Sequence, residues 1–522
     1  MRLAANRAVV RSVIVGLVLA VAVAVGYQLI SSADDGGGPI RVGTTDRVTA
    51  LDPAGAYDSG SWALYSNVYQ SLLTFDPGAT QPRPDAARAC AFQGADLTVY
   101  VCRLRPGLRF AGGRPITAED VKYSFDRVRR INDPRGPAPL FDTLAQVRAD
   151  GPDKVVFTLR TPDATFPFKI ATGAGSIVDR DTYPADHLHA GDGVTGSGPY
   201  VLKSYQPDDR AELRPNRHYR GAVTDVGGPV TIRYFRESAD LSGAWRRKEL
   251  DVVGRGMPPS EMAALKPGQD GITIMESAGA TTHSLVFNTR EKSAARDVAV
   301  RRAVAAVVDR DALARDVYRR TVEPLYSVVP QGITGHTTPF YDRYPEPDRA
   351  TARALLLATG QTLPVRLSLG YAHGEVAKRE TEELRRQLEA TGLFTVRTVE
   401  HEWGEFQSGF AKGEYDAFLV SWVADFPDPD TFVAAQMGSG SSWHNGYQDE
   451  EVDELIQDTQ RQSNRAAAVG DFRTLQQIAA RDVPLLPLWQ RKTQVLSTDS
   501  IAGTQYLSDG TGTWRLWRLS RL

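Results

Sequence analysis

Residues 416–429 have the sequence Asp-Ala-Phe-Leu-Val-Ser-Trp-Val-Ala-Asp-Phe-Pro-Asp-Pro. Residues 416–421 form an apolar run that is typical of a buried strand. Pro427 and Pro429 cannot continue a helix or a central strand, so a rigid loop is expected directly after this strand. The chain therefore places a constrained loop at the end of a buried strand.

This loop combines large aromatic rings with a carboxylate. Asp425 lies between Trp422 and Phe426 in the sequence. A carboxylate held between aromatic walls can pair with a ligand ammonium by charge-assisted hydrogen bonds, and the ring faces add cation–π attraction. The alternative is a structural turn in which Asp425 caps its own backbone. The residues alone leave both interpretations open.

The segments before this strand alternate between strand and helix. Residues 364–370 and 394–399 favour strands, and residues 375–390 and 406–412 favour helices. Such an order predicts an α/β fold with a parallel, doubly wound sheet. Ligands of these sheets bind beyond the carboxyl ends of the strands, which is where the loop after residue 421 begins.

Further periodic segments flank this block. Thr117 and Asp120 form a capping-box-like start to a helix over residues 116–130. Residues 296–320 predict one long helix, and residues 56–61 predict a polar loop in the first part of the chain. Strands are expected at residues 98–101, 154–160, 230–235, 284–288 and 485–490, and helices at residues 450–460 and 467–481.

Length and charge limit the functional classes. The 522 residues exceed what one hydrophobic core usually supports, which predicts two or more lobes. The 61 basic and 63 acidic residues nearly balance. Nucleic-acid binding usually shows as a clustered basic excess, so no nucleic-acid partner is expected.

The N-terminus has the order of an export signal. Arginines precede an apolar run over residues 13–30. A run of about 18 residues is long for a cleaved signal and just enough for a bilayer-spanning helix. We expect residues 1–33 to be a signal peptide or an N-terminal membrane anchor and residues 34–39 to be a flexible linker. Either way, the bulk of the chain is expected outside the cytoplasmic membrane.

The chain has two cysteines, Cys90 and Cys102. An even count outside the cytoplasm suggests one disulfide, and residues 93–96 between them resemble a hairpin turn. Two buried free thiols are the alternative. A metal site is not favoured, because no histidine or third cysteine is near in the sequence.

Common catalytic motifs are missing from the sequence, including G-x-S-x-G, H-E-x-x-H and the P-loop. Gly191, Gly193 and Gly196 have dinucleotide-loop spacing, but no apolar strand precedes them and no helix follows. His187 and His189 could ligate a metal, yet their spacing in a polar loop favours an ordinary connection. We therefore expect no catalytic residues, no cofactor and no metal site.

Several blocks together resemble one known family. They are residues 51–53 (LDP), 113–125 (GRPITAEDVKYSF), 196–200 (GSGPY) and 300–313 (VRRAVAAVVDRDAL). In order and spacing they are similar to the large solute-binding proteins of ABC importers, family 5, which include oligopeptide-, dipeptide- and nickel-binding members. The resemblance covers nearly everything after residue 39.

The resemblance implies an α/β fold: a periplasmic-binding-protein-like, two-lobed clam-shell with an extra inserted domain and mixed, doubly wound sheets. It implies three domains. Domain I is discontinuous and comprises residues 40–80, 193–278 and 495–522. Domain II is the insertion at residues 81–192, and domain III comprises residues 279–494.

The resemblance also implies a function and a set of ligand contacts. A di- to oligopeptide is expected to be captured between the lobes for import, without catalysis, by a monomer that delivers it to the permease and ATPase subunits. In peptide-binding members an aspartate in a W-x-x-D-x-x-[DE]-P loop pairs with the peptide ammonium, and Asp425 and Trp422 occupy those positions. Further contacts are expected at Phe426, Trp443, Trp62 and Ser61. For Trp443 and Trp62, a position in the hydrophobic core is an equally good interpretation.

Two features depart from the family pattern. No lipid-attachment cysteine follows the apolar run, and no motif singles out a basic residue for a peptide carboxylate, for which Arg385 and Arg386 are the candidates. The same scaffold could instead bind a nickel chelate, an oligosaccharide or an opine-like compound. An exported hydrolase and a membrane-tethered sensor remain as alternatives from other classes.

Overall fold

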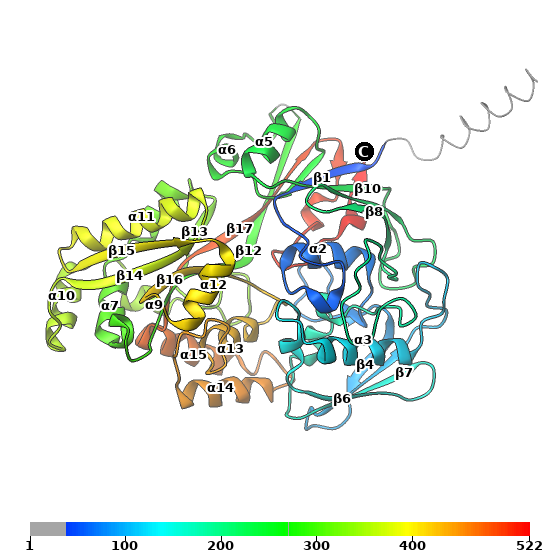
Figure 1. Cartoon of the computed structure of the whole chain (residues 1–522), viewed down its shortest axis with the longest axis horizontal. Coiled ribbons are helices and arrows are strands. Elements are labelled where there is room, and N and C mark those ends of the chain that lie inside the picture. The colour runs from blue at the N-terminus through cyan, green and yellow to red at the C-terminus, as the bar shows by residue number, and fades with distance from the viewer. Residues whose placement is uncertain (1–37, 270) are drawn as a thin grey trace, which may run out of the picture.

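The structure, a computed structural model, describes residues 38–269 and 271–522 and has two lobes (Figure 1). The predicted signal peptide or anchor at residues 1–33 lies outside the described residues. None of the helices within the described ranges combines the length and apolar character that a membrane crossing requires.

One sheet of the described chain extends through both lobes. Its strands are β1 (Ile40–Thr44), β8 (Tyr200–Gln206), β9 (Arg210–Pro215), β10 (Val230–Tyr234), β11 (Val252–Arg255), β12 (Ile272–Phe287), β13 (Val322–Pro324), β14 (Val365–Ala372), β15 (Phe394–His401), β16 (Ala417–Val423) and β17 (Leu485–Thr498). The 11 strands follow the order β15-β14-β16-β12-β17-β11-β1-β10-β9-β8, with β13 beside β17. The long strands β12 and β17 pair with each other and connect the lobes (Figure 1).

The sheet is mixed, as the resemblance implies. Strand β14 is parallel to β15 and β16, whereas β12 is antiparallel to both β16 and β17. The predicted parallel arrangement is therefore present in the outer strands of the second lobe, and in the first lobe β1 is also parallel to β10 and β11. The register places His283 between Ser421 and Trp489, and Thr282 between Trp422 and Gln490. This central row of residues lies next to the space between the lobes.

Helices and short strands complete the second lobe around a large apolar core. Its helices are η4 (Ala294–Arg296), α7 (Val298–Ala305), α8 (Arg310–Ala312), η5 (Leu313–Val317), α9 (Pro339–Arg343), α10 (Arg349–Ala358), α11 (Glu375–Ala390), α12 (Trp403–Lys412), α13 (Asp430–Met437), α14 (Glu450–Gln460) and α15 (Val469–Asp482). The predicted helices at residues 375–390 and 450–460 are confirmed with the same bounds.

The single long helix predicted over residues 296–320 is wrong. The chain breaks there into η4, α7, α8 and η5. Asp297 and Asp309 explain the breaks, since their side chains accept hydrogen bonds from the amides of Ala299 and Ala312. Aspartate is favoured at such helix starts over a helix interior. The apolar periodicity of the segment continued across two capping positions.

The first lobe has its own core, which also includes the inserted segment. Its further helices are η1 (Pro53–Gly55), α2 (Ser59–Val68), α3 (Ala118–Ile131), η2 (Ala138–Phe141), α4 (Phe166–Lys169), η3 (Gly173–Gly175), α5 (Ser238–Arg246), α6 (Pro259–Ala264), η6 (Thr504–Tyr506) and η7 (Leu516–Arg518). Its further strands are β2 (Leu73–Thr74), β3 (Arg83–Pro84), β4 (Ala87–Phe92), β5 (Val99–Leu104), β6 (Leu144–Ala149), β7 (Lys154–Leu159), β18 (Ile501–Ala502) and β19 (Ser520–Arg521).

The two cysteines lie in a separate four-stranded sheet with the order β4-β5-β7-β6. Cys90 on β4 is directly opposite Cys102 on β5, and a disulfide joins their sulfur atoms. The hairpin that the sequence suggested between them is present, because residues 93–98 connect the two antiparallel strands. The disulfide therefore ties an edge strand to its neighbour.

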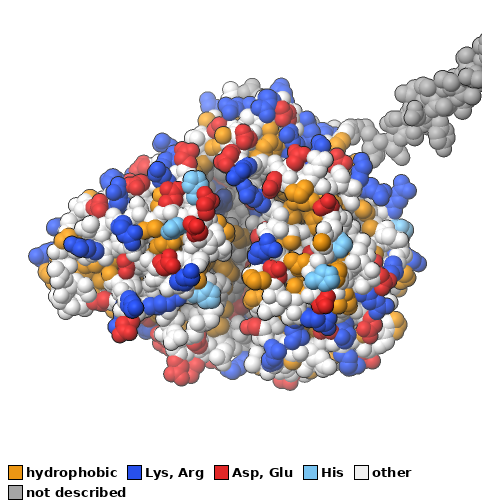
Figure 2. Space-filling view, viewed as in Figure 1, with side chains coloured by type: hydrophobic (Ala, Val, Ile, Leu, Met, Phe, Trp, Pro, Cys, Tyr) orange, Lys and Arg blue, Asp and Glu red, His pale blue; other side chains and the backbone are white. Residues whose placement is uncertain are grey.

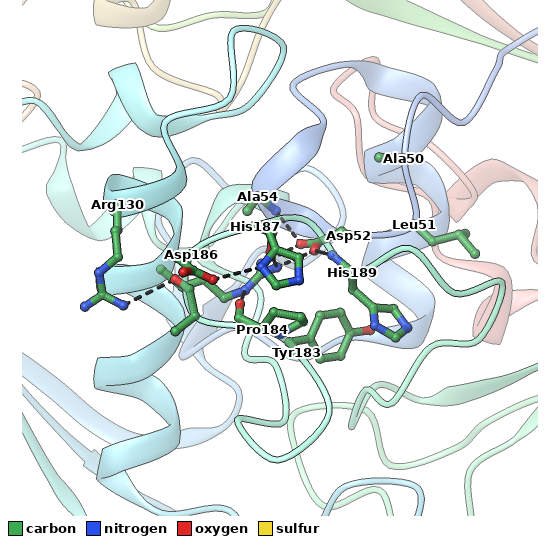
Figure 3. A network of polar contacts seen from close by, with 12 residues as sticks. Ala50, Leu51, Asp52, Ala54, Arg130, Tyr183, Pro184, Asp186, His187 and His189 are labelled. Atoms are coloured by element: carbon green, nitrogen blue, oxygen red, sulfur yellow. Dashed lines mark hydrogen bonds and ion pairs between the residues drawn. The ribbon is translucent and has the colours of Figure 1, made fainter.

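A buried ion pair joins the inserted segment to the rest of the first lobe. The Asp52 carboxylate accepts hydrogen bonds from Arg127 Nη1 at 2.7 Å and from the His189 backbone amide at 2.6 Å (Figure 3). Both charged side chains are 1% exposed. The His187 side chain lies 2.8 Å from the neighbouring Asp186 carboxylate, and the His187 backbone carbonyl accepts a hydrogen bond from Arg127 Nη2 at 2.8 Å. The two histidines thus do not converge, and their loop contributes a backbone contact.

Candidate functional site

A cavity of about 390 Å³ lies between the lobes beside the long strands. The molecular surface is hollowed along the line where the lobes meet (Figure 2). The first lobe contributes the end of β11 and the segment after it, and the second lobe contributes α11 and the row of β16, β12 and β17. A cavity of this size matches the range in which proteins usually bind small ligands.

Asp425 lies at the contact between the lobes. It follows β16, and the amide of Ala424 donates to Ala280 O at 3.0 Å, which continues the strand pairing by one step. Asp425 Oδ2 accepts hydrogen bonds from Tyr57 Oη at 2.8 Å and from Thr431 Oγ1 at 3.1 Å. Tyr57 belongs to the first lobe, so this hydrogen bond crosses from one lobe to the other.

The electrostatic surroundings of Asp425 are unusual for a carboxylate. Its side chain is only partly exposed and lies in a region that is crowded with protein atoms. Burial raises the pKa of Asp425 to about 6, against the opposing effect of hydrogen bonds from Tyr57 and Thr431. Within the described residues, no lysine, arginine or histidine nitrogen lies within 4.0 Å of the carboxylate. The group is thus a largely enclosed acid with no cation in ion-pair contact, and the charge of Lys169 acts on it only from further away.

The second carboxylate of the same loop is in a different situation. Asp428 is 3% exposed and accepts hydrogen bonds from Arg465 Nε and Nη2, both at 2.8 Å. It also accepts from the Asp430 amide at 2.9 Å. A bidentate arginine pair of this kind fixes geometry. Asp428 therefore has a structural role, and Asp425 alone retains capacity for a ligand.

The aromatic residues predicted as ligand contacts differ in their burial and in their neighbours. Trp422 is partly exposed and lies edge-on to Trp443, with ring centroids 5.4 Å apart. Trp443 is 5% exposed and belongs to the core of the second lobe. Phe426 is 2% exposed and packs 5.8 Å from Phe168 of the first lobe. Neither Asp425 nor these rings are among the side chains that line the 390 Å³ cavity.

Trp62 and Ser61 do not reach the space between the lobes. Residues 59–68 form helix α2, so the predicted loop ends earlier than expected. Ser61 is fully buried, and its Oγ donates to Asp58 and accepts from the Thr49 amide. Trp62 is 5% exposed and packs inside the first lobe behind Tyr57, with centroids 5.3 Å apart. Because the first turn of α2 faces inward, these two residues support the lobe.

Sequence reasoning missed a polar network in the cavity wall. His283 Nδ1 lies 2.7 Å from Ser421 Oγ, and His283 Nε2 lies 3.1 Å from Glu380 Oε2. Glu380 also accepts hydrogen bonds from Trp489 Nε1 at 2.7 Å and Tyr318 Oη at 2.8 Å. The five residues come from separate elements, so no local spacing connects them. A histidine in the middle of an apolar strand was the one available signal.

The ionised form of Glu380 is stabilised in this network. Burial by itself would raise the pKa of Glu380, but the electrostatic contribution of His283 and the hydrogen bonds from Trp489 and Tyr318 lower it overall. The His283 ring stacks on Trp489 with a centroid distance of 4.4 Å. The network therefore holds Ser421 in a fixed position at the cavity surface. In the described residues, no cluster of three or more His, Cys, Asp or Glu side chains is arranged to hold a metal ion.

Comparisons with known proteins identify a family model and relatives that match most of this chain. Residues 81–443 match the model of the "Bacterial extracellular solute-binding proteins, family 5 Middle". The chain is 25% identical over 467 residues to the "Probable D,D-dipeptide-binding periplasmic protein DdpA" of Escherichia coli (strain K12), covering 87% of this chain and 88% of that protein. It is 27% identical over 475 residues to "Di/tripeptide-binding protein 2" of Pseudomonas aeruginosa (strain UCBPP-PA14), covering 84% and 87%.

A solved structure confirms the fold. The periplasmic binding protein DppA from Helicobacter pylori, in complex with the peptide STSA, superposes with a TM-score of 0.80 and 22% identity, covering 93% of this chain and 98% of that one. The predicted two-lobed architecture is thereby confirmed. Because the family model matches more than half of the sequence, this chain belongs to the bacterial extracellular solute-binding proteins of family 5.

Proposed function

We propose that this protein is the extracytoplasmic solute-binding component of an ABC importer and that it captures short peptides between its lobes. The observation that carries the proposal is Asp425, an enclosed carboxylate at the lobe contact with no cation within ion-pair distance among the described residues. The relatives named above are described as dipeptide- and tripeptide-binding proteins, which supports a peptide as the solute.

Peptide capture follows from what this carboxylate can do. An ammonium group that enters beside Asp425 exchanges the unfavourable enclosure of a lone acid for a charge-assisted hydrogen bond. The Tyr57 hydroxyl remains protonated, because burial and the charge of Asp425 raise the pKa of Tyr57, and it donates from the other lobe. A ligand at this point therefore contacts both lobes and favours the state in which they are together.

The remaining features of the proposal concern location, partners and domains. The protein acts outside the cytoplasmic membrane as a monomer, is exported or anchored by residues 1–33, and delivers its solute to the permease, which carries the ATPase subunits. It breaks no bond in the solute. We infer the domain boundaries given above, and the boundaries at residues 278–279 and 494–495 fall inside β12 and β17, the two strands that connect the lobes.

Two measurements test the proposal. Native mass spectrometry of the purified protein is expected to show a peptide that was bound during expression. If the purified protein is empty, it is expected to bind a peptide from a mixture of di- and tripeptides, and this peptide is expected to be recovered intact. Calorimetry is expected to show that N-acetylation of the bound peptide, or Asp425→Ala, weakens binding by about 100- to 1,000-fold, because an enclosed charge then loses its partner. Equal affinity for free and acetylated peptides would refute the role of Asp425.

A further inference from the structure

The donors around Glu380 fix the direction of the hydrogen bonds in the cavity wall. Glu380 is buried and receives bonds from Trp489 Nε1 at 2.7 Å and Tyr318 Oη at 2.8 Å. An indole N–H group can only donate. The Tyr318 hydroxyl keeps its proton, because burial raises the pKa of Tyr318 well above its usual value. Glu380 therefore acts as an ionised carboxylate that only accepts, in agreement with its lowered pKa.

His283 connects this carboxylate to the cavity surface. Its Nε2 lies 3.1 Å from Glu380 Oε2, and its Nδ1 lies 2.7 Å from Ser421 Oγ. An unprotonated Nε2 would point its lone pair at a carboxylate, so a neutral imidazole carries its proton on Nε2. Nδ1 then has a lone pair. The ring is held in this orientation, because it stacks on Trp489 with an interplanar angle of 11°.

A cation elsewhere in the same wall favours a neutral His283 over a protonated one. Arg491 lines the cavity, and its guanidinium carbon lies 5.9 Å from the Trp489 ring centroid. Burial dominates the raised pKa of Tyr318, and the charge of Arg491 acts against it, so this charge reaches the hydroxyl that bonds to Glu380. The carboxylate is thus compensated without an imidazolium, and a second cation in this enclosed wall would be repelled.

The Ser421 hydroxyl then has a single orientation. Because Nδ1 of His283 has a lone pair, the hydroxyl proton is donated to that nitrogen, and only oxygen lone pairs face the cavity. Ser421 is exposed in the cavity wall, so a solute can reach this oxygen. An isolated serine hydroxyl rotates to donate or to accept, whereas this one can only accept.

We propose that Ser421 is a specificity-determining hydrogen-bond acceptor that requires a backbone N–H group in the bound peptide, and that Glu380 is the positioning residue that sets this polarity through His283. The inference rests on the proposed function, in which the solute is a short peptide. An ester bond or a prolyl residue at the same place has no N–H group and leaves the serine oxygen without a partner. The cavity thereby distinguishes an amide from an ester of the same shape.

Glu380→Gln changes the polarity of the network while it preserves the shape of the side chain. The amide oxygen of the glutamine can keep the bond from Trp489 Nε1, and its NH2 group then takes the place of Oε2 and donates to His283 Nε2. The imidazole proton is consequently expected on Nδ1, from which it is donated to Ser421 Oγ. The serine hydroxyl is then free to donate into the cavity, so its polarity is inverted.

The first measurement determines the tautomer of His283 in the full-length protein. Nitrogen NMR of protein with isotope-labelled histidine distinguishes a protonated from an unprotonated ring nitrogen, and the spectrum of His283→Gln assigns the signal among the eight histidines. At pH 7 the wild-type ring is expected to carry its proton on Nε2, and the ring in Glu380→Gln is expected to carry it on Nδ1. A wild-type ring that is protonated on Nδ1, or on both nitrogens, overturns the proposal.

The second measurement compares amide and ester ligands by titration calorimetry. The probes are Ala-Ala, Ala-Ala-Ala and their analogues in which one amide N–H group is replaced by an ester oxygen. The wild-type protein is expected to bind one analogue about 10-fold or more weakly than its peptide. This difference is expected to disappear in Ser421→Ala and to disappear or reverse in Glu380→Gln. Ser284→Ala, which removes a hydroxyl from the opposite face of β12, is expected to keep it.

The possible outcomes separate this inference from the proposed function. Wild-type protein that binds every ester as tightly as its peptide, or a Ser421→Ala variant that keeps the wild-type difference, overturns the role of Ser421 and leaves peptide binding intact. A Glu380→Gln variant that keeps the wild-type tautomer and the wild-type difference overturns the role of Glu380. Failure of every probe to bind wild-type protein overturns the short-peptide function, and with it the requirement for a peptide N–H group. The ester changes only the ligand, so the wild-type result does not depend on how the variants fold.

Discussion

The raised pKa of Asp425 predicts that peptide affinity falls as pH decreases. Burial raises this pKa to about 6, so the carboxyl group of the ligand-free protein is mostly ionised at pH 7 and mostly protonated at pH 5. An ammonium pairs only with the ionised form, and binding must therefore release a proton at low pH. Below pH 6 the neutral acid predominates in the empty protein, whereas the complex requires the carboxylate, so peptide affinity falls as the pH decreases.

The magnitude follows from the same value. With a pKa of about 6, roughly nine tenths of the molecules carry the carboxylate at pH 7 and roughly one tenth at pH 5, which weakens binding about tenfold, or about 1.4 kcal/mol. The peptide itself does not titrate in this window, since an α-amino group has a pKa of about 7.7–8.0 and an α-carboxyl group about 3.3–3.7. Above pH 8 the affinity is expected to fall again as the peptide loses its ammonium.

Calorimetry at pH 5, 6 and 7, in buffers with different ionisation enthalpies, measures both the affinity and the proton release. About half a proton is expected to be released at pH 6, because half of the carboxyl groups are then protonated in the empty protein. Asp425→Asn is expected to bind weakly with a flat profile between pH 5 and 7. Asp430→Asn is the matched control, because burial also raises the pKa of Asp430 to about 6 while Gln460 holds its side chain at 3.0 Å.

Two results refute this reasoning. One is wild-type affinity that is the same at pH 5 and pH 7. The other is an Asp425→Asn variant that keeps the wild-type pH dependence, which would assign the titration to another group in or near the cavity.

Three further predictions concern stability. Asp52→Ala leaves Arg127 buried without its partner and is expected to lower the free energy of unfolding by about 3–5 kcal/mol in urea titrations. Replacing Cys90 and Cys102 together by alanine is expected to cost about 3 kcal/mol in the same titrations, because the short loop between them is no longer closed in the unfolded chain. Trp62→Ala removes a side chain that is 5% exposed and is expected to cost about 3–5 kcal/mol in thermal unfolding, with peptide binding at saturating ligand retained.

Each stability prediction has a defined control or contrary result. Glu383→Ala removes the partner of the exposed Arg386 and is expected to lower the free energy of unfolding by less than about 1 kcal/mol. If Asp52→Ala lowers it by no more than this, the structural role of Asp52 is contradicted. Unfolding of the wild-type protein that does not change on reduction contradicts a stabilising disulfide. A folded Trp62→Ala variant that no longer binds peptide would show that Trp62 contacts the ligand.

The sequence alone determined the elements whose signals are local. The helices at residues 375–390 and 450–460 have the predicted bounds, because amphipathic spacing and terminal residues lie within the helix itself. The loop that carries Asp425 could also be located, since two prolines end the strand before it. The family resemblance then predicted the lobes, as order and spacing along a chain are sequence properties.

The tertiary structure decided which side chains meet. Asp425 accepts a hydrogen bond from Tyr57, which lies 368 residues earlier in the chain. His283 lies between Ser421 and Trp489 only because β12 pairs with both β16 and β17. No periodicity encodes such contacts, because they depend on strand order and on how two lobes approach. For the same reason Trp62 could not be distinguished as core or wall: its environment is set by the packing of distant segments, and the structure places it in the core.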